Sequence, residues 1–183
     1  MDAKTVLVDE LRSHALVIGD VVLTSGRTAP YYVDAKRAIL RQPGFGALGE
    51  LVAATARELG ATAVGGLTMG ADPVACAALA GGFDGKAFFV RKESKQHGLQ
   101  RRIEGPFLEP GDRCLVVEDV ATTGGSALQA IAALQEEGHE VVGVLSVLDR
   151  LAGAREALEA ATSAPYRPCT TIDDVYPDRP DHG

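Results

Sequence analysis

Residues 115–126 read LVVEDVATTGGS, and this stretch decides how we expect the chain to fold. An apolar run with the composition of a buried strand ends in two adjacent carboxylates, Glu118 and Asp119. A loop of small hydroxyl and glycine residues follows, and residues 126–137 then carry apolar side chains at helical spacing. Open α/β sheets bind ligands outside the carboxyl ends of their strands. The stretch therefore predicts such a sheet, with a binding site at this strand end.

The loop in this stretch has the chemistry of a phosphate-binding site. Gly124 and Gly125 allow the backbone to approach a ligand closely, and Thr122, Thr123 and Ser126 offer hydroxyl donors. The start of the following helix adds unpaired N–H groups and a favourable dipole. The acidic pair before the loop cannot bind phosphate, so its natural partners are hydroxyls, Mg²⁺ or a developing positive charge. Loop and carboxylates together predict a site for a sugar phosphate.

The rest of the chain repeats this alternation of strands and helices. Apolar or β-branched runs predict strands at 62–67, 87–90 and 141–148, and helical spacing predicts helices at 43–59 and 74–80. Asp72 and Pro73 have the composition of an N-cap and first turn for the second of these helices. The pattern predicts an α/β fold with a mainly parallel central sheet flanked by helices.

A chain of 183 residues is long enough for one such domain, and we expect a single domain over 1–183. Its core is expected at 60–150. Residues 1–40, with a helix near 5–14 and two short strands, are expected to form a small hood region over one end of the sheet. Four prolines and several acids follow residue 164, and we expect 174–183 to be a flexible tail.

The charge pattern argues against nucleic acid as a ligand and favours a small anionic molecule. A net charge of −7 argues against a nucleic-acid partner, because duplex affinity comes largely from clustered lysine and arginine. The segment 91–102 (RKESKQHGLQRR) breaks the acidic trend, since it holds five of the 18 basic residues and only one acid. A local basic segment in an acidic protein predicts a small, highly anionic ligand.

Composition also indicates the cellular compartment of the protein. No apolar stretch approaches the roughly 20 residues needed to cross a bilayer, and the first residues do not form a signal-peptide core. The three cysteines, Cys76, Cys114 and Cys169, are odd in number and lack C-x-x-C spacing, which is typical of free thiols. We therefore expect a cytoplasmic protein without a membrane partner.

Four segments together resemble the orotate phosphoribosyltransferases, a family of type I phosphoribosyltransferases. The 115–126 stretch is similar to their phosphoribosyl-diphosphate signature. SGRTAPYY at 25–32 looks like their N-terminal hood, RKESKQHG at 91–98 like their catalytic loop, and VLDR at 147–150 like their orotate-anchoring strand end. The resemblance implies a type I phosphoribosyltransferase fold and transfer of phosphoribosyl from 5-phosphoribosyl 1-diphosphate to orotate, in the synthesis of pyrimidine nucleotides.

The resemblance also implies roles for particular residues. Phosphoribosyl diphosphate would be bound by Arg91, Lys92, Lys95, His97, Glu118, Asp119, Val120, Ala121, Thr122, Thr123, Gly124, Gly125 and Ser126. Orotate would be bound by Thr122, Arg150 and Tyr32, and catalysis would rest on Lys95, His97 and Asp119. Glu118 and Asp119 would hold Mg²⁺ indirectly, together with the substrate. The family also implies a homodimer in which the loop 91–104 reaches the neighbouring active site.

The chain departs from the family pattern at two places and leaves alternatives open. Where relatives often carry lysines, it has Thr24 and the stretch 68–70, so diphosphate binding would rely more on the backbone N–H groups of 68–72 and on the loop 91–97. A purine or other phosphoribosyltransferase is the nearest alternative, and Arg150 argues against it because only a carboxylate acceptor needs that group. A non-catalytic sensor of phosphoribosyl diphosphate is a second. A dinucleotide-binding site at GFGALG, 44–49, lacks the preceding strand it would need.

Overall fold

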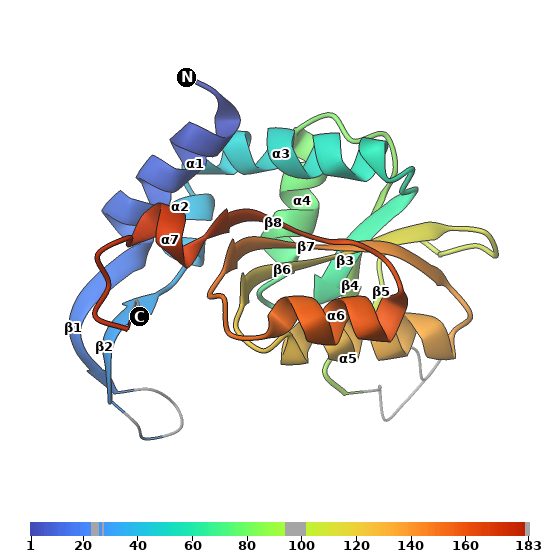
Figure 1. Ribbon diagram of the computed structural model, residues 1–183. Helices are drawn as coiled ribbons and strands as arrows, with labels where there is room; N and C mark the ends of the chain where they lie inside the picture. Colours follow the sequence, from blue (N-terminus) through green and yellow to red (C-terminus); the bar gives the residue numbers. More distant parts are fainter. Residues whose placement is uncertain (23–25, 27, 94–101, 182–183) are drawn as a thin grey trace.

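A six-stranded sheet forms the centre of the computed structural model, which describes residues 1–22, 26, 28–93 and 102–181 (Figure 1). The strand order is β5-β4-β3-β6-β7-β8. The strands are β3 (Ala63–Leu67), β4 (Lys86–Val90), β5 (Ile103–Glu104), β6 (Arg113–Ala121), β7 (Glu140–Asp149) and β8 (Tyr166–Thr171). All neighbours are parallel except the short β5, which runs antiparallel to β4. The four strands predicted from sequence are therefore confirmed, as is the mainly parallel α/β sheet.

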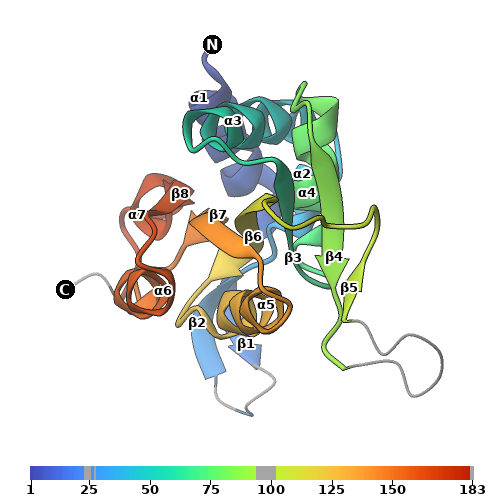
Figure 2. The same ribbon diagram turned by 90° about the vertical axis from the view of Figure 1, so that its right-hand side faces the viewer.

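Helices cover both faces of the sheet (Figure 2). The helices are α1 (Ala3–Glu10), α2 (Lys36–Ile39), α3 (Gly44–Glu58), α4 (Asp72–Ala80), α5 (Gly125–Glu136), α6 (Ala154–Thr162) and α7 (Ile172–Val175). Successive side chains of β6 point to opposite faces of the sheet and so contribute to two separate core clusters. Leu115 and Val117 pack in a cluster with α1, α3 and α4, whereas Cys114 and Val116 pack with α5 and α6. GFGALG, 44–49, forms the start of α3 and does not follow a strand.

The hood region is a two-stranded antiparallel hairpin with short helices around it. Strand β1 (Leu16–Val22) follows α1 and a π-helical turn, η1 (Leu11–Ala15), and pairs with β2 (Thr28–Val33). The hairpin extends from the lower left of the sheet in Figure 1. Residue Lys36 begins α2, which leads from the hairpin back to the sheet.

The C-terminal part of the fold and the start of α4 bear on the sequence expectations. The segment after residue 164 contains β8 and α7, neither of which was predicted; Pro168 is tolerated because β8 lies at the edge of the sheet. The described part of the expected tail, 174–181, contains the end of α7 and contacts the hood region, and the flexibility of 174–183 stays a prediction. Asp72 was wrongly predicted as an N-cap, since Ala71 holds that position and the Asp72 carboxylate accepts a hydrogen bond from the Thr68 hydroxyl.

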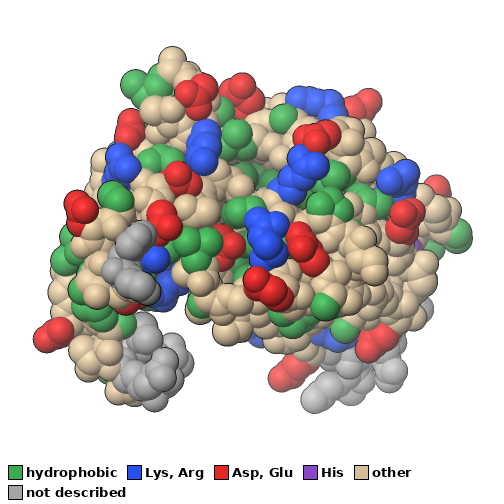
Figure 3. Space-filling view, viewed as in Figure 1, with side chains coloured by type: hydrophobic (Ala, Val, Ile, Leu, Met, Phe, Trp, Pro, Cys, Tyr) green, Lys and Arg blue, Asp and Glu red, His purple; other side chains and the backbone are tan. Residues whose placement is uncertain are grey.

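Charges of both signs are interspersed on the surface. On the face shown in Figure 3, lysine and arginine side chains lie among aspartate and glutamate side chains.

None of the helices in the described residues combines the length and apolar character that crossing a bilayer requires.

Asp112 provides a stability prediction at the end of the sheet opposite the carboxyl ends of the strands. Its buried carboxylate accepts hydrogen bonds from Lys86 Nζ, Thr62 Oγ1 and the Glu109 N–H, each at 2.7 Å. Burial opposes its charge, but these donors outweigh that effect and lower the Asp112 pKa to about 2. A lowered carboxyl pKa stabilises the fold above the unfolded value near pH ~4, and that contribution is lost as pH falls toward ~2.

We therefore expect Asp112→Asn to lower the free energy of unfolding at neutral pH by about 1–2 kcal/mol. The difference from the parent should shrink as pH falls below ~4, where the parent carboxylate also becomes protonated. Urea unfolding at several pH values would measure both quantities, with the exposed Asp84→Asn as control. A deficit that stays constant down to pH ~3 would contradict this explanation.

Candidate active site

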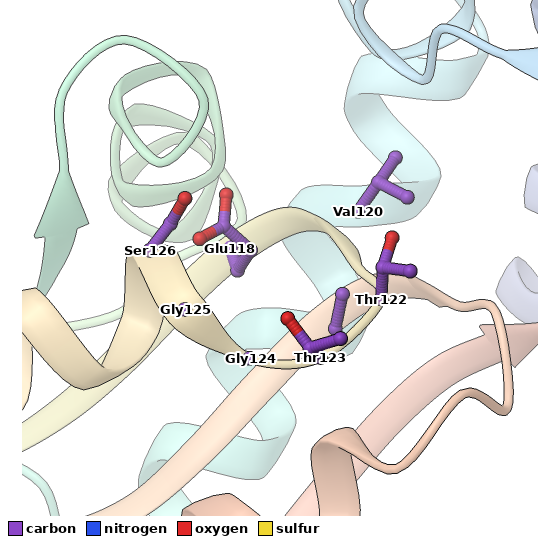
Figure 4. A pocket seen from close by; sticks show the side chains of 8 residues that line it. Glu118, Val120, Thr122, Thr123, Gly124, Gly125 and Ser126 are labelled. Carbon is purple, nitrogen blue, oxygen red and sulfur yellow. The ribbon is translucent and has the colours of Figure 1, made fainter. Parts of the chain in front are cut away.

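The carboxyl ends of β3, β6 and β7 meet at one edge of the sheet and carry the predicted ligand-binding residues. The loop between β6 and α5 encloses a pocket of about 190 Å³ (Figure 4). It is lined by Glu118, Val120, Ala121, Thr122, Thr123, Gly124, Gly125 and Ser126. These are eight of the residues predicted to bind phosphoribosyl diphosphate, and the fold brings them together.

Local backbone geometry explains the glycine in this loop. Gly124 is the N-cap of α5 and adopts φ +82°, a left-handed conformation that side chains disfavour. A β-carbon at this position would also lie 3.1 Å from Leu158 of α6. Gly124 therefore lets α5 begin directly behind the loop, so that the free N–H groups of its first turn face the pocket's hydroxyl residues.

The acidic pair of β6 is buried and directly connected to the hood region. Glu118 is 6% exposed and Asp119 8% exposed. Asp119 accepts hydrogen bonds from its neighbour Val120 N–H at 2.9 Å and from Lys36 Nζ at 2.8 Å. Lys36 also lies 3.1 Å from Asp34, so one ammonium group connects the end of the hairpin with the sheet.

The two carboxyl groups are in different electrostatic states. Burial and the adjacent Asp119 carboxylate raise the pKa of Glu118 well above its ordinary value. Burial acts in the same direction on Asp119, but hydrogen bonds from Glu118 and Lys36 outweigh it and lower the Asp119 pKa. Burial opposes the charge of Lys36, whose pKa is nevertheless raised by Asp119 and Asp34. Asp119 is therefore the charged member of the pair, with Lys36 as its counter-ion.

Lys36 is the site residue that sequence reasoning missed. It lies at the end of the hood segment, 83 residues before its partner Asp119, and no local pattern connects the two. The only signal in the sequence is its place two residues after Asp34, just beyond the predicted second strand of the hood region.

The loop after β3 approaches the same carboxylates. A β-carbon on Gly70 would lie 2.5 Å from Asp119 Oδ1 and 3.0 Å from Glu118 Oε1, so only glycine fits beside the pair. The backbone donors predicted here are partly used within the protein. The N–H groups of Thr68, Ala71 and Asp72 donate to carbonyls at 2.8–3.4 Å. Within the described residues, this leaves the amides of 69 and 70 for a ligand.

Arg150 lies directly beside the loop of β6. Its backbone N–H donates to the Ala121 carbonyl at 2.9 Å, one residue before Thr122. Its guanidinium carbon is 5.0 Å from the centre of the Tyr31 ring. The structure thus brings Tyr31 against Arg150, whereas its neighbour Tyr32 is 40% exposed. Tyr32 as an orotate-binding residue stays a prediction.

The basic segment leaves the sheet at the end of β4. Arg91 lies 3.4 Å from Glu104 of β5, and its N–H donates to the Arg102 carbonyl at 2.8 Å. Lys92 follows on the surface. Lys95, His97 and Thr24 lie outside the described residues, so their places in the site stay predictions.

The donor set near the pocket fits a hard divalent cation held together with a substrate. Glu118 Oε2 is buried without a hydrogen-bond partner among the described residues, and carboxylate oxygens are the ligands that Mg²⁺ prefers. Two carboxylates fall short of a complete protein cage, and no group of three or more potential ligands occurs in the described parts of the chain. Substrate oxygens would have to supply the remaining positions.

Comparison with known proteins defines the class to which this site belongs. The phosphoribosyl transferase domain model matches residues 38–172, which include the pocket, Arg150 and all six strands of the central sheet. The chain therefore belongs to the phosphoribosyltransferases. The fold and the resemblance predicted from sequence are both confirmed.

The curated relatives show which phosphoribosyltransferases this chain is similar to in sequence. The orotate phosphoribosyltransferase of Corynebacterium glutamicum strain R is 48% identical over 176 residues, covering 96% of this chain and 95% of that one. That of Streptomyces avermitilis is 48% identical, covering 91% and 93%. The solved complex of Mycobacterium tuberculosis orotate phosphoribosyltransferase with 5-phospho-alpha-D-ribosyl 1-diphosphate is 41% identical, with a TM-score of 0.81 and coverage of 94% and 98%. The chain belongs to the orotate phosphoribosyltransferase family and is a pentosyltransferase.

Proposed function

We propose that this chain transfers the phosphoribosyl group of 5-phosphoribosyl 1-diphosphate to a ring nitrogen of orotate. The products are orotidine 5′-phosphate and diphosphate, and the reaction serves pyrimidine nucleotide synthesis. One observation carries the proposal: the buried acidic pair Glu118–Asp119, the hydroxyl-rich pocket and Arg150 converge at one edge of the sheet. That set offers complementary groups for a ribose, a phosphate and a carboxylate.

The donor substrate is bound by β6 and the loop that follows it. The hydroxyls of Thr122, Thr123 and Ser126 and the first N–H groups of α5 bind the 5′-phosphate. Glu118 and Asp119 accept hydrogen bonds from the ribose hydroxyls. Bound Mg²⁺ would neutralise diphosphate charge and take oxygens from the substrate and, directly or indirectly, from the acidic pair.

The acceptor is bound next to the pocket by Arg150, Thr122 and Tyr32. A guanidinium group can pair with the orotate carboxylate in bidentate geometry, which fixes both distance and orientation. Because Arg150 is bonded through its backbone to Ala121, the acceptor is held at a set place relative to the ribose phosphate. This positioning is the main contribution of the fold to the rate.

In the chemical step, the bond between C1 of the ribose and the diphosphate oxygen breaks as the bond from orotate nitrogen to C1 forms. The oxygen electron pair leaves with diphosphate, whose charge is neutralised by Arg91, Lys92, Lys95 and His97. Asp119, charged beside Lys36, stabilises the positive charge that develops on the ribose ring. The ring nitrogen of orotate is already acidic, so its proton passes to the leaving diphosphate or to water with little help from a protein base.

The proposal includes a cytoplasmic homodimer in which the loop 91–104 acts on the neighbouring site. The free thiols of Cys76, Cys114 and Cys169 fit a reducing compartment. The described ends of this loop, residues 91–93 and 102–104, lie at the edge of the sheet where β5 pairs with β4. This edge position supports the proposal, because a segment that starts at a sheet edge can reach a second subunit.

Hybrid dimers test this arrangement. Lys95→Ala and Asp119→Asn chains, each with its own tag, are expected to be nearly inactive alone. A purified hybrid of the two should recover roughly half of the parent activity, because one of its two sites combines an intact pocket with an intact loop. A hybrid as inactive as both parents would show that each loop serves its own site.

The acceptor is tested by measuring diphosphate release with orotate, uracil, hypoxanthine and adenine in the presence of Mg²⁺. We expect release with orotate only. Release with a purine or with uracil would assign the chain to another acceptor, and no release with any base despite tight binding of phosphoribosyl diphosphate would indicate a sensor.

A further inference from the structure

Tyr31 is a buried ring that joins three separate parts of the chain. It is 2% exposed. The Arg150 guanidinium lies over its face at 5.0 Å, and the ring of Tyr176 meets it edge-on, with centroids 5.5 Å apart and planes at 86°. Its hydroxyl donates to Asp181 Oδ2 at 3.1 Å. Tyr31 is thus fixed by the C-terminal segment on one side and contacts Arg150 on the other.

The C-terminal segment is itself firmly held. Thr171 and Asp174 form a capping box that starts α7, and Arg12 of η1 donates to the Asp174 carbonyl. Arg179 is ion-paired with Asp173, and its Nε lies 3.1 Å from Asp181 Oδ1. Figure 1 shows this segment passing from β8 toward the hood region, and the hydrogen bond between Tyr31 and Asp181 joins it to β2. The partners of Tyr31 therefore have fixed positions of their own.

The contact with Arg150 has an orienting effect. A guanidinium group held over an aromatic face loses rotational freedom, so its N–H donors keep a fixed direction. Edge-to-face contact with Tyr176 fixes the angle of the Tyr31 ring, and its hydrogen bond to Asp181 fixes the position of the ring along its axis. Without these contacts, the ring could turn and Arg150 would lose its support.

We propose that the segment 176–181 positions Arg150 through Tyr31 and so sets the affinity for the carboxylate-bearing acceptor. The inference rests on the proposed function of Arg150. Tyr31, Tyr176 and Asp181 are positioning residues here, because they act through the arginine. The donor substrate, bound at the β6 loop, is not under their control.

The test compares Tyr176→Leu with Tyr176→Phe. The leucine variant should lower kcat/KM for orotate about three- to tenfold while KM for phosphoribosyl diphosphate stays within about twofold. The phenylalanine variant keeps the ring and should behave like the parent. Phe107→Leu, a loss of an exposed aromatic ring elsewhere, is the matched control. A parallel weakening for both substrates would overturn the proposal, as would an unchanged kcat/KM for orotate.

A double-mutant cycle separates positioning from general packing. Adding Tyr176→Leu to Arg150→Ala should change kcat/KM for orotate no further, because the arginine through which Tyr176 acts is absent. Independent, multiplicative losses would contradict the inference. If Tyr176→Leu does not fold, Asp181→Ala replaces it in the same cycle, with an expected loss of about two- to threefold.

A measurement without turnover distinguishes this inference from the proposed function. The Nε–H signal of Arg150 in ligand-free protein, assigned with Arg150→Lys, should shift in Tyr176→Leu and not in Tyr176→Phe, because the Tyr31 ring lies next to it. If this shift occurs but the protein releases no diphosphate with orotate, the positioning of Arg150 through Tyr31 stands. Only the assignment of orotate as the acceptor is then overturned. An unshifted signal would overturn the positioning itself.

Discussion

Lys95→Ala is expected to lower the turnover number by roughly 100- to 1,000-fold, the largest effect of any single change considered. Diphosphate leaves with several negative charges, and a lysine that neutralises them contributes mainly when the C–O bond is breaking. The affinity for phosphoribosyl diphosphate should therefore fall much less than kcat. Steady-state kinetics with Mg²⁺ and saturating orotate, together with direct binding of the donor substrate, would separate the two quantities.

A matched control is Lys4→Ala, which removes an exposed lysine of α1 that forms an ion pair with Asp174 of α7. It should retain parent kinetics. Near-normal turnover of Lys95→Ala would show that the assignment of the basic loop is wrong.

Gly70→Ala is expected to lower kcat/KM about 100-fold without unfolding the protein. The new β-carbon would overlap Asp119 Oδ1 at 2.5 Å, and Asp119 cannot simply turn away because Lys36 and the Val120 N–H hold it. Displacement of the carboxylates would misplace the ribose relative to the acceptor. Kinetics at saturating Mg²⁺ and thermal unfolding of the same samples would show the loss of activity and the retained fold.

The control for this substitution is Gly46→Ala on α3. Its new β-carbon meets only the end of the flexible Gln42 side chain, at 3.0 Å. If Gly70→Ala and Gly46→Ala have the same kcat/KM, the acidic pair does not have to stay where the structure places it.

Much of the fold could be predicted because its signals are local. The run 115–126 contains strand, acidic pair, loop and helix start in consecutive positions, so periodicity and residue type suffice. The strands at 62–67, 87–90 and 141–148 were recognisable in the same way. Strand β8 was not, because Pro168 is tolerated only at a sheet edge, and edge position depends on the order of all the strands.

The candidate site likewise contains residues that local sequence patterns predicted and contacts that depend on the packing of the whole fold. The pocket residues are neighbours in sequence, and the sequence predicted all of them. The contact of Lys36 with Asp119 and that of Tyr31 with Arg150 join residues more than 80 positions apart, and they depend on how the hood region packs against the sheet. Alternation along β2 buries Tyr31 and exposes Tyr32, and no sequence pattern indicated that Tyr31 would contact Arg150; acceptor binding by Tyr32 stays a prediction.

The hydrogen bond from Arg150 N–H to the Ala121 carbonyl bears on how this fold can change acceptor over evolution. The bond uses only main-chain atoms, so any residue except proline can preserve it. If Arg150 has the proposed role, a substitution at position 150 would alter which base is recognised, while the pocket next to it keeps its shape. Acceptor preference and donor binding can therefore diverge separately, one side chain at a time.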